Sequence, residues 1–469
     1  MTEHDAIRQL HPTLLWNAFV DLNAVPRGSK KETAVSNFVV GRGKMLGLET
    51  RSDRLGNVLI CKPATLGYES HTPVVLQSHI DMVWQKNSNT AFDFDTQGIR
   101  MFVDGDWVRA KGTTLGADNG IGVSSIFSVL ESKDLSHPAL ECIFTIDEET
   151  GMTGAKELDS TWLQGKVLLN LDTEQDNELT IGCAGGADVT AMAAYAPEPV
   201  ASDASPFRIH VSGLKGGHSG MEIHLGRANA NKIMNRLLYI ASKKFGLRLA
   251  RLEGGSLRNA IPRESLAAVF VPNANCQAFL DWIQHESLVI QAENMVTDPN
   301  LKIDCEKGTS DSRDVLPIKM QATLVSVVHG VLSGIHRMSP SIQGLVQTSN
   351  NLARVVVENG QMSIMCLARS SVNTERDALT DSLSSVLEQL GGSVEVGGQY
   401  PGWQPEPESK IVRLMRSLYV EMFQDEPHVA ACHAGLECGI IGGKFPGMEM
   451  ISFGPNILGA HSPDDRVQI

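Results

Sequence analysis

Short apolar runs that stop abruptly at polar or acidic residues recur along the chain. The runs and the residues that follow them are 74–77 before His79, 141–146 before Asp147 and 167–171 before Asp172. Runs of this length between turn residues are typical of buried strands. Helical patterns alternate with them through the first 190 residues. This alternation predicts an α/β fold with a largely parallel sheet between helices.

His79 and Asp81 stand two residues apart at the end of the first run. Residues i and i+2 of a strand share a face, so the Asp81 carboxylate can reach the far imidazole nitrogen of His79 while the near nitrogen binds a metal. From this fragment alone, an ordinary polar strand terminus is the commoner outcome. The pair indicates a metal site only if further ligands follow.

Asp118 lies in a Gly-rich turn, 112–122, that runs into an apolar stretch, 123–130, typical of a helix. A carboxylate at a helix start is favoured as a cap and by the helix macrodipole. The glycines favour another interpretation, because such turns let the backbone approach a ligand closely. A structural cap and a metal ligand both stay open at this position.

Further carboxylates follow the next two predicted strands, namely Glu148, Glu149 and Asp172. A solvated acidic turn is the common outcome for such acids, but open α/β sheets carry their chemistry beyond the carboxyl ends of the strands. A second histidine, His461, follows a short predicted strand and a Gly/Pro turn. Two His and several carboxylates, without Cys, suit zinc, manganese or cobalt. Two ions would explain the excess of acids.

Several other motifs occur in order along the chain. They read GCAGGAD at 182–188, KGGHSG at 215–220, LRNAIPR at 257–263, YPGWQP at 400–405 and HAGLECG at 433–439. With the ligand motifs, they resemble the M20 family of dinuclear metallopeptidases, most closely its aminoacyl-histidine dipeptidase branch, also called Xaa-His or cytosol non-specific dipeptidases. The resemblance covers essentially the whole chain. It implies a hydrolase of dipeptides with free termini, Xaa-His and broader, that uses two divalent metal ions, zinc before cobalt or manganese.

The resemblance also implies a role for each candidate ligand. Asp118 would bridge the two metal ions. Glu149 and His461 would complete one metal site, and His79 and Asp172 would complete the other.

Two further residues of the same region have implied roles in catalysis. Glu148 would be the general base, which takes a proton as water attacks the peptide carbonyl and delivers it to the leaving amine. Asp81 would orient His79. Glu148 must then stay free of metal while its neighbour Glu149 binds.

Four residues of the following segment have roles that rest on the resemblance alone. His218 would stabilise the oxyanion, and Arg369 would bind the substrate carboxylate with its guanidinium fork. Asn259 and the backbone of Gly435 would assist Arg369. Without the resemblance, such residues are usually ordinary loop or solvated side chains.

The order of the candidate ligands predicts an inserted domain. They come from 79–172 and then from His461, so the segment between must leave the catalytic layer and return. We expect a catalytic di-metal domain formed by 1–187 and 393–469, and an inserted α+β lid domain formed by 188–392.

The lid segment shows a repeated pattern. The stretches 254–272 and 347–371 both read as turn, strand, turn and strand, and an amphipathic stretch follows each. This indicates an internal duplication. Since smaller M20 enzymes complete each active site with a lid residue from a partner subunit, a doubled lid could supply His218 and Arg369 from one chain.

Composition adds limits. A chain of 469 residues with 42% hydrophobic residues is expected to be globular, with two or more domains. Its net charge of −14 argues against nucleic acid or an anionic membrane surface as partners.

No apolar run suits a membrane span, and the first residues do not resemble a signal peptide. Eight Cys without a C-x-x-C motif are expected to be reduced thiols of a cytoplasmic protein, and the family resemblance is compatible with a homodimer.

Three functions stay open. The leading one is a metal-dependent dipeptidase, and the second is an amidase or deacylase of N-acyl amino acids on the same scaffold. These two differ in whether the substrate carries a free α-amine. The third is a non-catalytic metal-binding protein with a relic site, which is disfavoured because Glu148 and every ligand position are filled.

Overall fold

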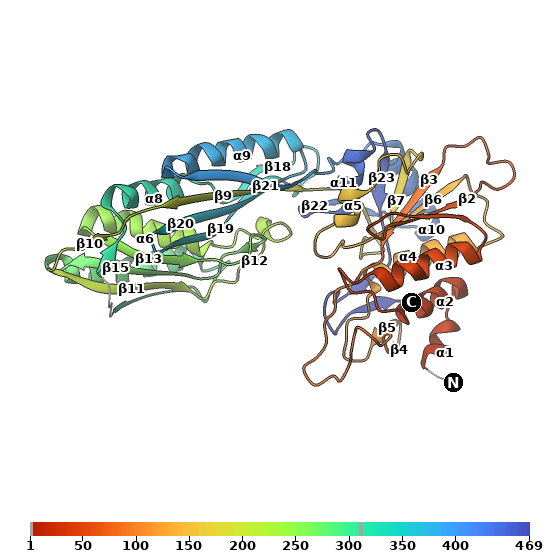
Figure 1. Ribbon diagram of the computed structural model, residues 1–469, viewed down its shortest axis with the longest axis horizontal. Helices are drawn as coiled ribbons and strands as arrows, with labels where there is room; N and C mark the ends of the chain where they lie inside the picture. Colours follow the sequence, from red (N-terminus) through yellow and green to blue (C-terminus); the bar gives the residue numbers. More distant parts are fainter. Residues whose placement is uncertain (1–2, 309–312) are drawn as a thin grey trace. The chain divides into compact units, whose positions relative to one another are not determined.

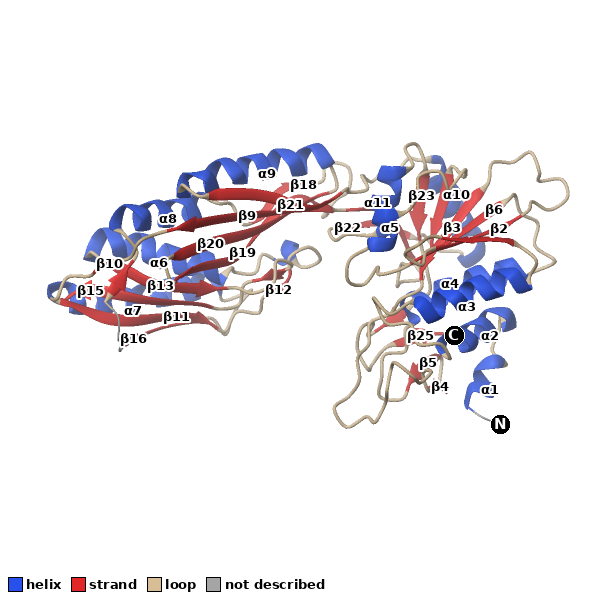
Figure 2. Ribbon diagram, in the orientation of Figure 1, coloured by secondary structure: helices blue, strands red, loops and turns tan. Residues whose placement is uncertain are grey.

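The structure, a computed structural model, describes residues 3–308 and 313–469. The chain forms two compact units. The first comprises Met1–Gly182, Pro405–Ala431 and Leu436–Ile469, and the second comprises Cys183–Gln404 and Cys432–Gly435. Figures 1 and 2 label the helices and strands of both units.

An eight-stranded sheet lies at the centre of the first unit. Its strands follow the order β1 (Glu49–Ser52), β2 (Val58–Lys62), β6 (Leu140–Thr145), β3 (Val74–His79), β7 (Val167–Asn170), β23 (Glu449–Ser452), β8 (Glu178–Cys183) and β22 (His428–Cys432). The central strands β6, β3, β7 and β23 are parallel. The β1–β2 pair is antiparallel because its short connection cannot form a crossover. The predicted α/β class with a largely parallel sheet is confirmed.

Helices cover one face of this sheet. They are α2 (Thr13–Asn23), α3 (Thr33–Met45) and α4 (Ala117–Glu131). Leu22, Val39 and Phe127 of these helices share a buried cluster with Leu76 of β3 and Phe144 of β6. This apolar layer fixes the strands whose ends carry the candidate ligands.

The opposite face is covered as well. Successive residues of a strand point to opposite faces, so Gln77 points away from the cluster that contains Leu76. Its Nε2 donates to Glu437 Oε2 of α11 (Glu437–Lys444) at 2.7 Å. Helices on both faces are what a parallel sheet requires.

A smaller sheet in the same unit frames the loop that carries His461. Its order is β24 (Ile457–Leu458), β25 (Arg466–Gln468), β5 (Trp107–Ala110) and β4 (Met101–Asp104). His461 lies between β24 and β25, which pair with each other. The remaining helices of the unit are α1 (Glu3–Arg8), α5 (Thr153–Glu157) and α10 (Lys410–Phe423).

The second unit is built on a nine-stranded sheet. Its order is β16 (Lys302–Lys307), β11 (Ala204–Ser212), β15 (Ser265–Pro272), β13 (Arg248–Gly254), β19 (Val346–Glu358), β20 (Gln361–Ser370), β9 (Gly185–Ala194) and β21 (Ser393–Tyr400), and β18 (Gly334–Met338) pairs with β19. Each of these pairs is antiparallel. Two short pairs join β10 (Glu198–Pro199) to β17 (Asp314–Val315) and β12 (Gly217–His218) to β14 (Ala260–Ile261).

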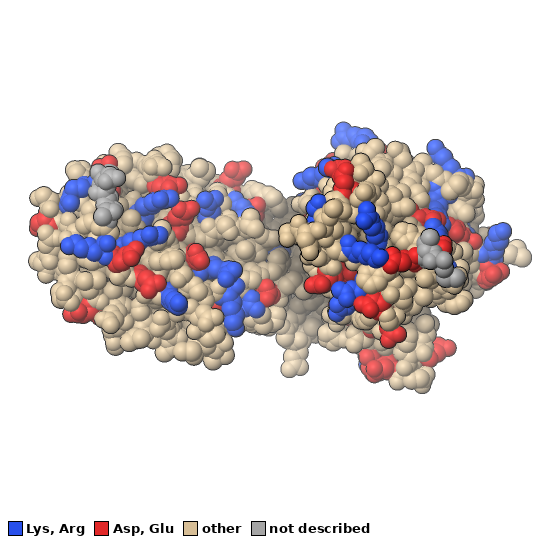
Figure 3. Space-filling view, turned by 90° about the horizontal axis from the view of Figure 1, so that it is seen from below, with Lys and Arg blue, Asp and Glu red and all other residues tan. Residues whose placement is uncertain are grey.

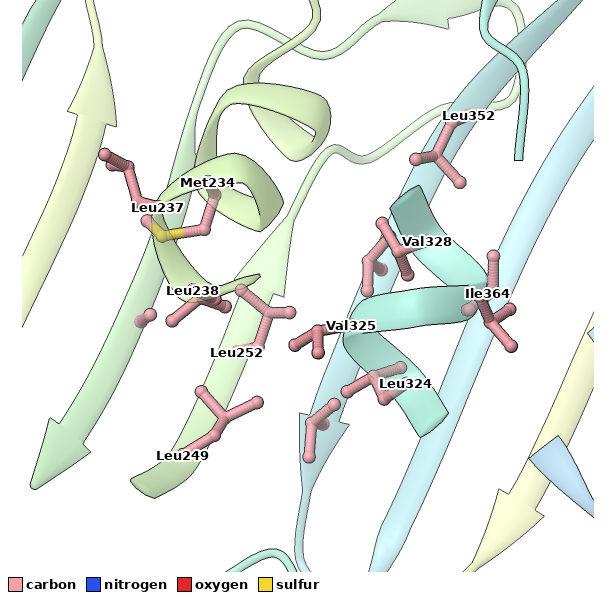
Figure 4. Close-up of a cluster of buried hydrophobic side chains, with 14 of the residues drawn as sticks. Met234, Leu237, Leu238, Leu249, Leu252, Leu324, Val325, Val328, Leu352 and Ile364 are labelled. Carbon is pink, nitrogen blue, oxygen red and sulfur yellow. The ribbon is translucent and has the colours of Figure 1, made fainter. Parts of the chain in front are cut away.

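Four helices share one buried cluster with this sheet and are labelled in Figure 2: α6 (Ala230–Phe245), α7 (Cys276–Asn294), α8 (Ile318–Gly330) and α9 (Asn373–Leu387). Along β9, Ala191 and Ala193 are buried while Met192 between them is 51% exposed, so only one face is covered. Figure 4 shows side chains of α6 and α8 meeting those of β13, β19 and β20. The α+β character predicted for this segment is confirmed.

The nine-stranded sheet contains two halves with one connectivity. The first half runs β11–α6–β13–β15–α7–β16 along the chain and is ordered β16-β11-β15-β13 in space. The second half runs β9–α8–β19–β20–α9–β21 and is ordered β21-β9-β20-β19. The halves meet where β13 pairs with β19, and the first half is inserted in sequence between β9 and α8.

Surface features agree with the composition. Within the described part of the chain, no helix is long and apolar enough to cross a membrane. On the face that Figure 3 shows, Lys and Arg side chains lie among Asp and Glu side chains in both units. None of the eight cysteines, all of which lie in the described part of the chain, forms a disulfide.

Candidate metal centre

The candidate ligands of the first unit gather at one edge of its sheet. His79 is the last residue of β3, Glu149 follows β6, and Asp172 follows β7. The carboxyl ends of parallel strands meet at one edge, where open α/β sheets carry their chemistry. The apolar runs therefore position these polar side chains.

Asp118 lies between two histidines. Its Oδ1 is 3.0 Å from His79 Nε2, and its Oδ2 is 3.2 Å from His461 Nε2. The α4 N-cap residue is Gly116, which has a positive φ of 72°, and Asp118 has non-helical dihedral angles at a kink in the first turn. Because the Asp118 carboxylate faces the two histidines, the geometry favours a ligand over a structural cap.

The remaining two candidates complete the cluster. Asp172 Oδ1 lies 3.3 Å from His79 Nε2, and Glu149 Oε2 lies 2.8 Å from His461 Nε2. One potential ligand atom from each of His79, Asp118 and Glu149 lies within 4.8 Å of the others. The structure thus brings all five predicted ligands together.

Asp81 contacts the nitrogen of His79 that does not face Asp118. Its Oδ1 is 3.3 Å from His79 Nδ1, so the other ring nitrogen of His79 faces Asp118. The fully buried Asp81 carboxylate also accepts hydrogen bonds from Ser29 Oγ at 2.8 Å and from the backbone N–H groups of Glu148 and Glu149 at 3.1 and 3.3 Å. Asp81 therefore contacts both His79 and the backbone of the acidic turn.

The acidic turn is buried rather than solvated. Only 4% of Asp147 is exposed, and only 4% of the Glu149 side chain. Asp147 has a positive φ of 55° and accepts hydrogen bonds from the hydroxyls of Thr150 and Thr153. The interpretation of this turn as a solvated loop is wrong.

Crowding of acids shifts the protonation of the cluster. Burial acts to lower the pKa of His79, but the nearby carboxylates outweigh burial and hold this pKa well above its usual value. Hydrogen bonds to Asp118 and Glu149 raise the pKa of His461 to about 11. Burial raises the pKa of Glu149 and Asp172. The acids and the imidazoles of the cluster are thus electrostatically coupled.

This donor set fits divalent metal ions. It offers imidazole nitrogens and carboxylate oxygens, which suit zinc, manganese or cobalt. Glu149 Oε1 is buried without a hydrogen-bond partner, and a buried polar atom normally has one. A cation at this edge would supply that partner and replace the protons on the histidines.

Arg27 is a buried cation that sequence reasoning missed. Its Nη1 donates to the carbonyls of Ile80 and Asp81 at 3.3 and 3.0 Å, and its Nη2 donates to Asn23 Oδ1 at 3.2 Å and to the Gly116 carbonyl. Burial lowers its pKa to about 10, and nearby acids oppose the shift. Arg27 therefore joins the end of β3 to the turn before Asp118.

Other polar residues that sequence reasoning missed fix the same turn. Asp465 Oδ2 accepts hydrogen bonds from the backbone N–H groups of Leu115 at 3.0 Å and Gly116 at 2.8 Å. Asn119 Nδ2 donates to Asp172 Oδ1. The Asp465 contacts hold the turn before Asp118, and the Asn119 contact holds the Asp172 carboxylate.

Glu437 adds a buried carboxyl group to the unit. Its Oε2 accepts from Gln77 Nε2 at 2.7 Å and from Thr145 Oγ1 at 2.6 Å. Burial raises its pKa to about 8, and the nearby acids Asp172 and Asp81 add to the shift. The residue lies in the 433–439 motif, but nothing local in that motif indicates this contact.

In the second unit, Arg369 is a buried guanidinium on β20. It is 5% exposed, and its Nη1 donates to the Tyr400 hydroxyl at 2.9 Å. Its Nε has no hydrogen-bond partner, and among the residues that the structure describes it forms no ion pair. A buried, unpaired guanidinium fork suits a carboxylate ligand.

His218 lies on the short strand β12 of the same unit. Its Nδ1 accepts hydrogen bonds from the backbone N–H groups of Gly220 at 3.2 Å and Met221 at 3.0 Å. Burial and the nearby Arg369 lower its pKa. Both effects favour a neutral ring with its proton on Nε2, which is then a hydrogen-bond donor.

The two assisting residues also belong to the second unit. The Asn259 carbonyl accepts from Ser219 N at 2.7 Å, which joins it to the loop of His218. Gly435 ends the segment Cys432–Gly435. Two residues before it in sequence is a residue without a predicted role, His433, whose Nε2 lies 2.7 Å from Ser349 Oγ.

Comparison with known proteins supplies an independent test. The sequence model of Peptidase family M20/M25/M40 matches residues 75–469. The chain is 39% identical to the cytosol non-specific dipeptidase of Escherichia coli (strain K12) over 463 residues, which cover 99% of this chain and 95% of that protein.

Solved structures give the same result. The aminoacylhistidine dipeptidase of Vibrio alginolyticus matches with a TM-score of 0.92 and 40% identity, over 98% of this chain and 94% of that one. The aminopeptidase PepT of Bacillus cereus, at 18% identity, shares the fold with a TM-score of 0.54 over 97% and 93% of the two chains. Since the family's pattern extends over most of the sequence and two relatives match nearly from end to end, the chain belongs to peptidase family M20/M25/M40.

Proposed function

We propose that this protein is a metal-dependent dipeptidase that hydrolyses dipeptides with free termini, Xaa-His dipeptides among them. One observation carries the proposal: Asp118 turns one carboxylate oxygen to His79 and the other to His461, as a ligand shared by two metal ions would. Two relatives similar over nearly their full length are named as dipeptidases. A relic site is disfavoured because Glu148 and all five candidate ligands are present.

Two divalent ions, zinc before cobalt or manganese, are the cofactors of this proposal. Asp118 would bridge them, His79 and Asp172 would hold one, and Glu149 and His461 would hold the other. When bound, the ions would lower the pKa of a water molecule and polarise the peptide carbonyl.

Glu148 is the residue that moves the proton. Its backbone N–H donates to Asp81 Oδ1 at 3.1 Å, which fixes the residue beside the ligands. Burial raises its pKa well above the usual value, and the nearby acids Asp172 and Glu437 add to the shift. A carboxylate with a raised pKa can accept a proton from the attacking water and return it to the leaving amine.

Residues of the second unit bind the substrate and the developing oxyanion in this proposal. Arg369 would bind the free carboxylate of the dipeptide, with help from Asn259 and the backbone at Gly435. The Nε2–H of neutral His218 would donate to the oxyanion. The unpaired guanidinium and the accepting His218 Nδ1 support these roles.

An amidase or deacylase of N-acyl amino acids is the alternative on the same scaffold, and one experiment separates the two. Purified protein reconstituted with zinc would be assayed on Ala-His, Ala-Ala, a tripeptide and N-acetyl-His, with Glu148→Ala alongside. Cleavage of the dipeptides alone, abolished in the variant, is the expected result. Turnover of N-acetyl-His in place of the dipeptides would move the assignment to a deacylase, and no turnover at all would favour the relic site.

The domain plan and cellular location belong to the same proposal. We propose that the lid segment, 188–392, was inserted between two parts of the catalytic domain and that it arose by duplication. The shared connectivity of its two sheet halves supports the duplication. A cytoplasmic location is supported by eight cysteines outside disulfides and by the name of the Escherichia coli relative.

A further inference from the structure

Three residues on neighbouring strands of the second unit form one row across its sheet. Arg369 of β20 lies opposite Gly186 of β9, and Gly186 lies opposite Tyr400 of β21. Figure 2 shows these three strands side by side. Residues directly opposite each other on paired strands point to the same face of a sheet. The side chains of Arg369 and Tyr400 therefore emerge on one face, from strands about 10 Å apart.

Gly186 leaves the space between these two side chains open. A Cβ atom on Gly186 would lie 2.6 Å from Tyr400 Cε1 and 2.7 Å from its Cζ and its hydroxyl oxygen. The Tyr400 ring therefore lies directly over Gly186. It crosses β9, and its hydroxyl accepts a hydrogen bond from Arg369 Nη1 at 2.9 Å. Any larger residue at position 186 would move the ring away from Arg369.

A β-bulge in β21 sets Tyr400 into this row. The register between β21 and β9 shifts between Gly397 and Tyr400, so that three steps along β21 correspond to two steps along β9. The extra residue is accommodated where Gly398 has a positive φ of 59°, a conformation that glycine adopts without strain. In a regular register Gln399 would lie opposite Gly186, and the phenol would point to the other face of the sheet.

The hydrogen bond fixes Arg369 without neutralising its charge. Burial raises the pKa of Tyr400, so its hydroxyl is an uncharged acceptor. Asp188, an acid of β9, pairs instead with Arg258, whose Nε lies 3.3 Å from Asp188 Oδ2. The positive charge of Arg369 thus stays available to a ligand.

The same hydrogen bond selects one edge of the guanidinium. A guanidinium binds a carboxylate either end-on, through Nη1 and Nη2, or side-on, through Nε and Nη2. Tyr400 engages Nη1 of Arg369, whereas the buried Nε has no hydrogen-bond partner. A buried donor is normally paired, so the side-on edge is the one that a ligand carboxylate would satisfy.

We propose that Tyr400 is a positioning residue for substrate recognition. By holding Nη1, it orients Arg369 so that Nε and Nη2 bind the free carboxylate of the dipeptide side-on. The inference rests on the proposed function, in which Arg369 binds that carboxylate. Gly186 serves the same recognition by admitting the phenol ring. The motifs at 182–188 and 400–405 thus meet at Arg369.

The first test compares Ala-Ala with its C-terminal amide as substrates of the zinc-reconstituted full chain. Tyr400→Phe removes only the hydroxyl, and its KM for Ala-Ala is expected to rise about 10-fold, as on loss of one hydrogen bond to a charged group. KM for the amide and kcat for both substrates are expected to stay at the wild-type values, whereas a purely structural role would change both substrates alike. Gly186→Ala displaces the ring and is expected to give the same selective rise. Tyr195→Phe, at a half-buried tyrosine of the same unit outside the row, is the matched control and should change neither substrate.

A double-mutant cycle tests whether Tyr400 acts through Arg369. Arg369→Met removes the donor, so adding Tyr400→Phe to it should raise KM for Ala-Ala no further. An unchanged KM for Ala-Ala in Tyr400→Phe, an equal rise for Ala-Ala and its amide, or a full additional rise in the double variant would overturn the proposal. Failure of the proposed function would look different: the wild-type chain would not cleave Ala-Ala, or Arg369→Met would leave KM for Ala-Ala unchanged. Either of these results would overturn both proposals.

Discussion

Glu148 and Glu149 are adjacent acids with different surroundings. Glu149 lies against His461, whereas Glu148 is set by its backbone hydrogen bond to Asp81 and has a pKa raised well above its usual value by burial. Proton transfer by a positioned carboxylate contributes about 10²- to 10⁴-fold to a rate. In the proposed mechanism, Glu148 therefore transfers the proton and Glu149 binds a metal ion.

We therefore expect Glu148→Gln to lower kcat on Ala-His by about 10²- to 10⁴-fold while the zinc content stays at the wild-type level. Steady-state kinetics and metal analysis of the same sample check this. Glu149→Gln is the matched control, since it should lose metal as well as activity. Loss of zinc from both variants would show that Glu148 is a ligand.

Arg369 is expected to act on substrate affinity. Arg369→Lys keeps a positive charge but loses the planar fork that binds a carboxylate through two hydrogen bonds. We expect KM for Ala-Ala to rise about 10-fold or more, equal to at least about 1.4 kcal/mol of binding, and metal content to stay unchanged. An equal loss for Ala-Ala and for its C-terminal amide would contradict recognition of the carboxylate.

His433 is expected to reduce the stability of the protein as the pH falls. Burial and Arg369 lower its pKa from 6.5 to about 3, so the folded protein binds fewer protons than the unfolded chain between these values. The free energy of unfolding then falls as pH drops through this window, by up to about 1.4 kcal/mol per pH unit from this group. Urea unfolding at pH 7 and pH 5 should show a smaller loss for His433→Gln than for wild type. Equal losses would mean that His433 is protonated in the folded state.

At the scale of elements, Arg27 joins the end of β3 to the start of α4. It donates to carbonyls at the end of β3 and to Gly116 at the start of α4. Removing it leaves these buried carbonyls unpaired, at about 1–3 kcal/mol each. The alignment of His79 with Asp118 depends on the same contacts.

Arg27→Met is expected to lower the free energy of unfolding by about 3 kcal/mol or more and to weaken zinc binding. Arg54→Met, at an exposed position of the same unit, should change stability by about 0.5 kcal/mol or less. Urea unfolding and competition with a zinc chelator measure the two quantities. Unchanged zinc affinity in Arg27→Met would limit the role of Arg27 to folding.

Residues that follow a recognisable strand could be predicted from the sequence, whereas residues with distant partners could not. His79, Glu148, Glu149 and Asp172 were found because each follows an apolar run, which is a local pattern. Arg27 was missed because its partner Gly116 is 89 residues away, and nothing near Arg27 indicates that it is buried.

Longer separations hid other supporting contacts. Gln77 and Glu437 are 360 residues apart, and Leu115 and Asp465 are 350 apart. Such contacts depend on the order of strands in the sheet, which hydrophobic periodicity does not specify. The fold class could be predicted because alternating helices and strands constrain it, whereas the supporting network could not.

At the scale of the whole molecule, metal binding is expected to stabilise the chain. Ligands that bind only the folded state add about 4 kcal/mol at a free concentration 1,000 times Kd. Calorimetry should therefore show a lower Tm after chelation and recovery on adding zinc. His461→Ala should recover less than wild type, since one of the two proposed sites loses a ligand. An identical Tm with and without zinc would contradict binding at this cluster.

The separation of the ligands along the chain has a consequence for biosynthesis. Four of the five lie between His79 and Asp172, and His461 comes 289 residues after Asp172 (461 − 172). At about 5–20 residues per second, the ribosome adds that stretch in about 15–60 s. Throughout this interval the nascent chain exposes an acidic, partly assembled cluster without its last histidine. Metal loading of the complete centre is thus a late event, delayed by the time needed to synthesise all of the second unit.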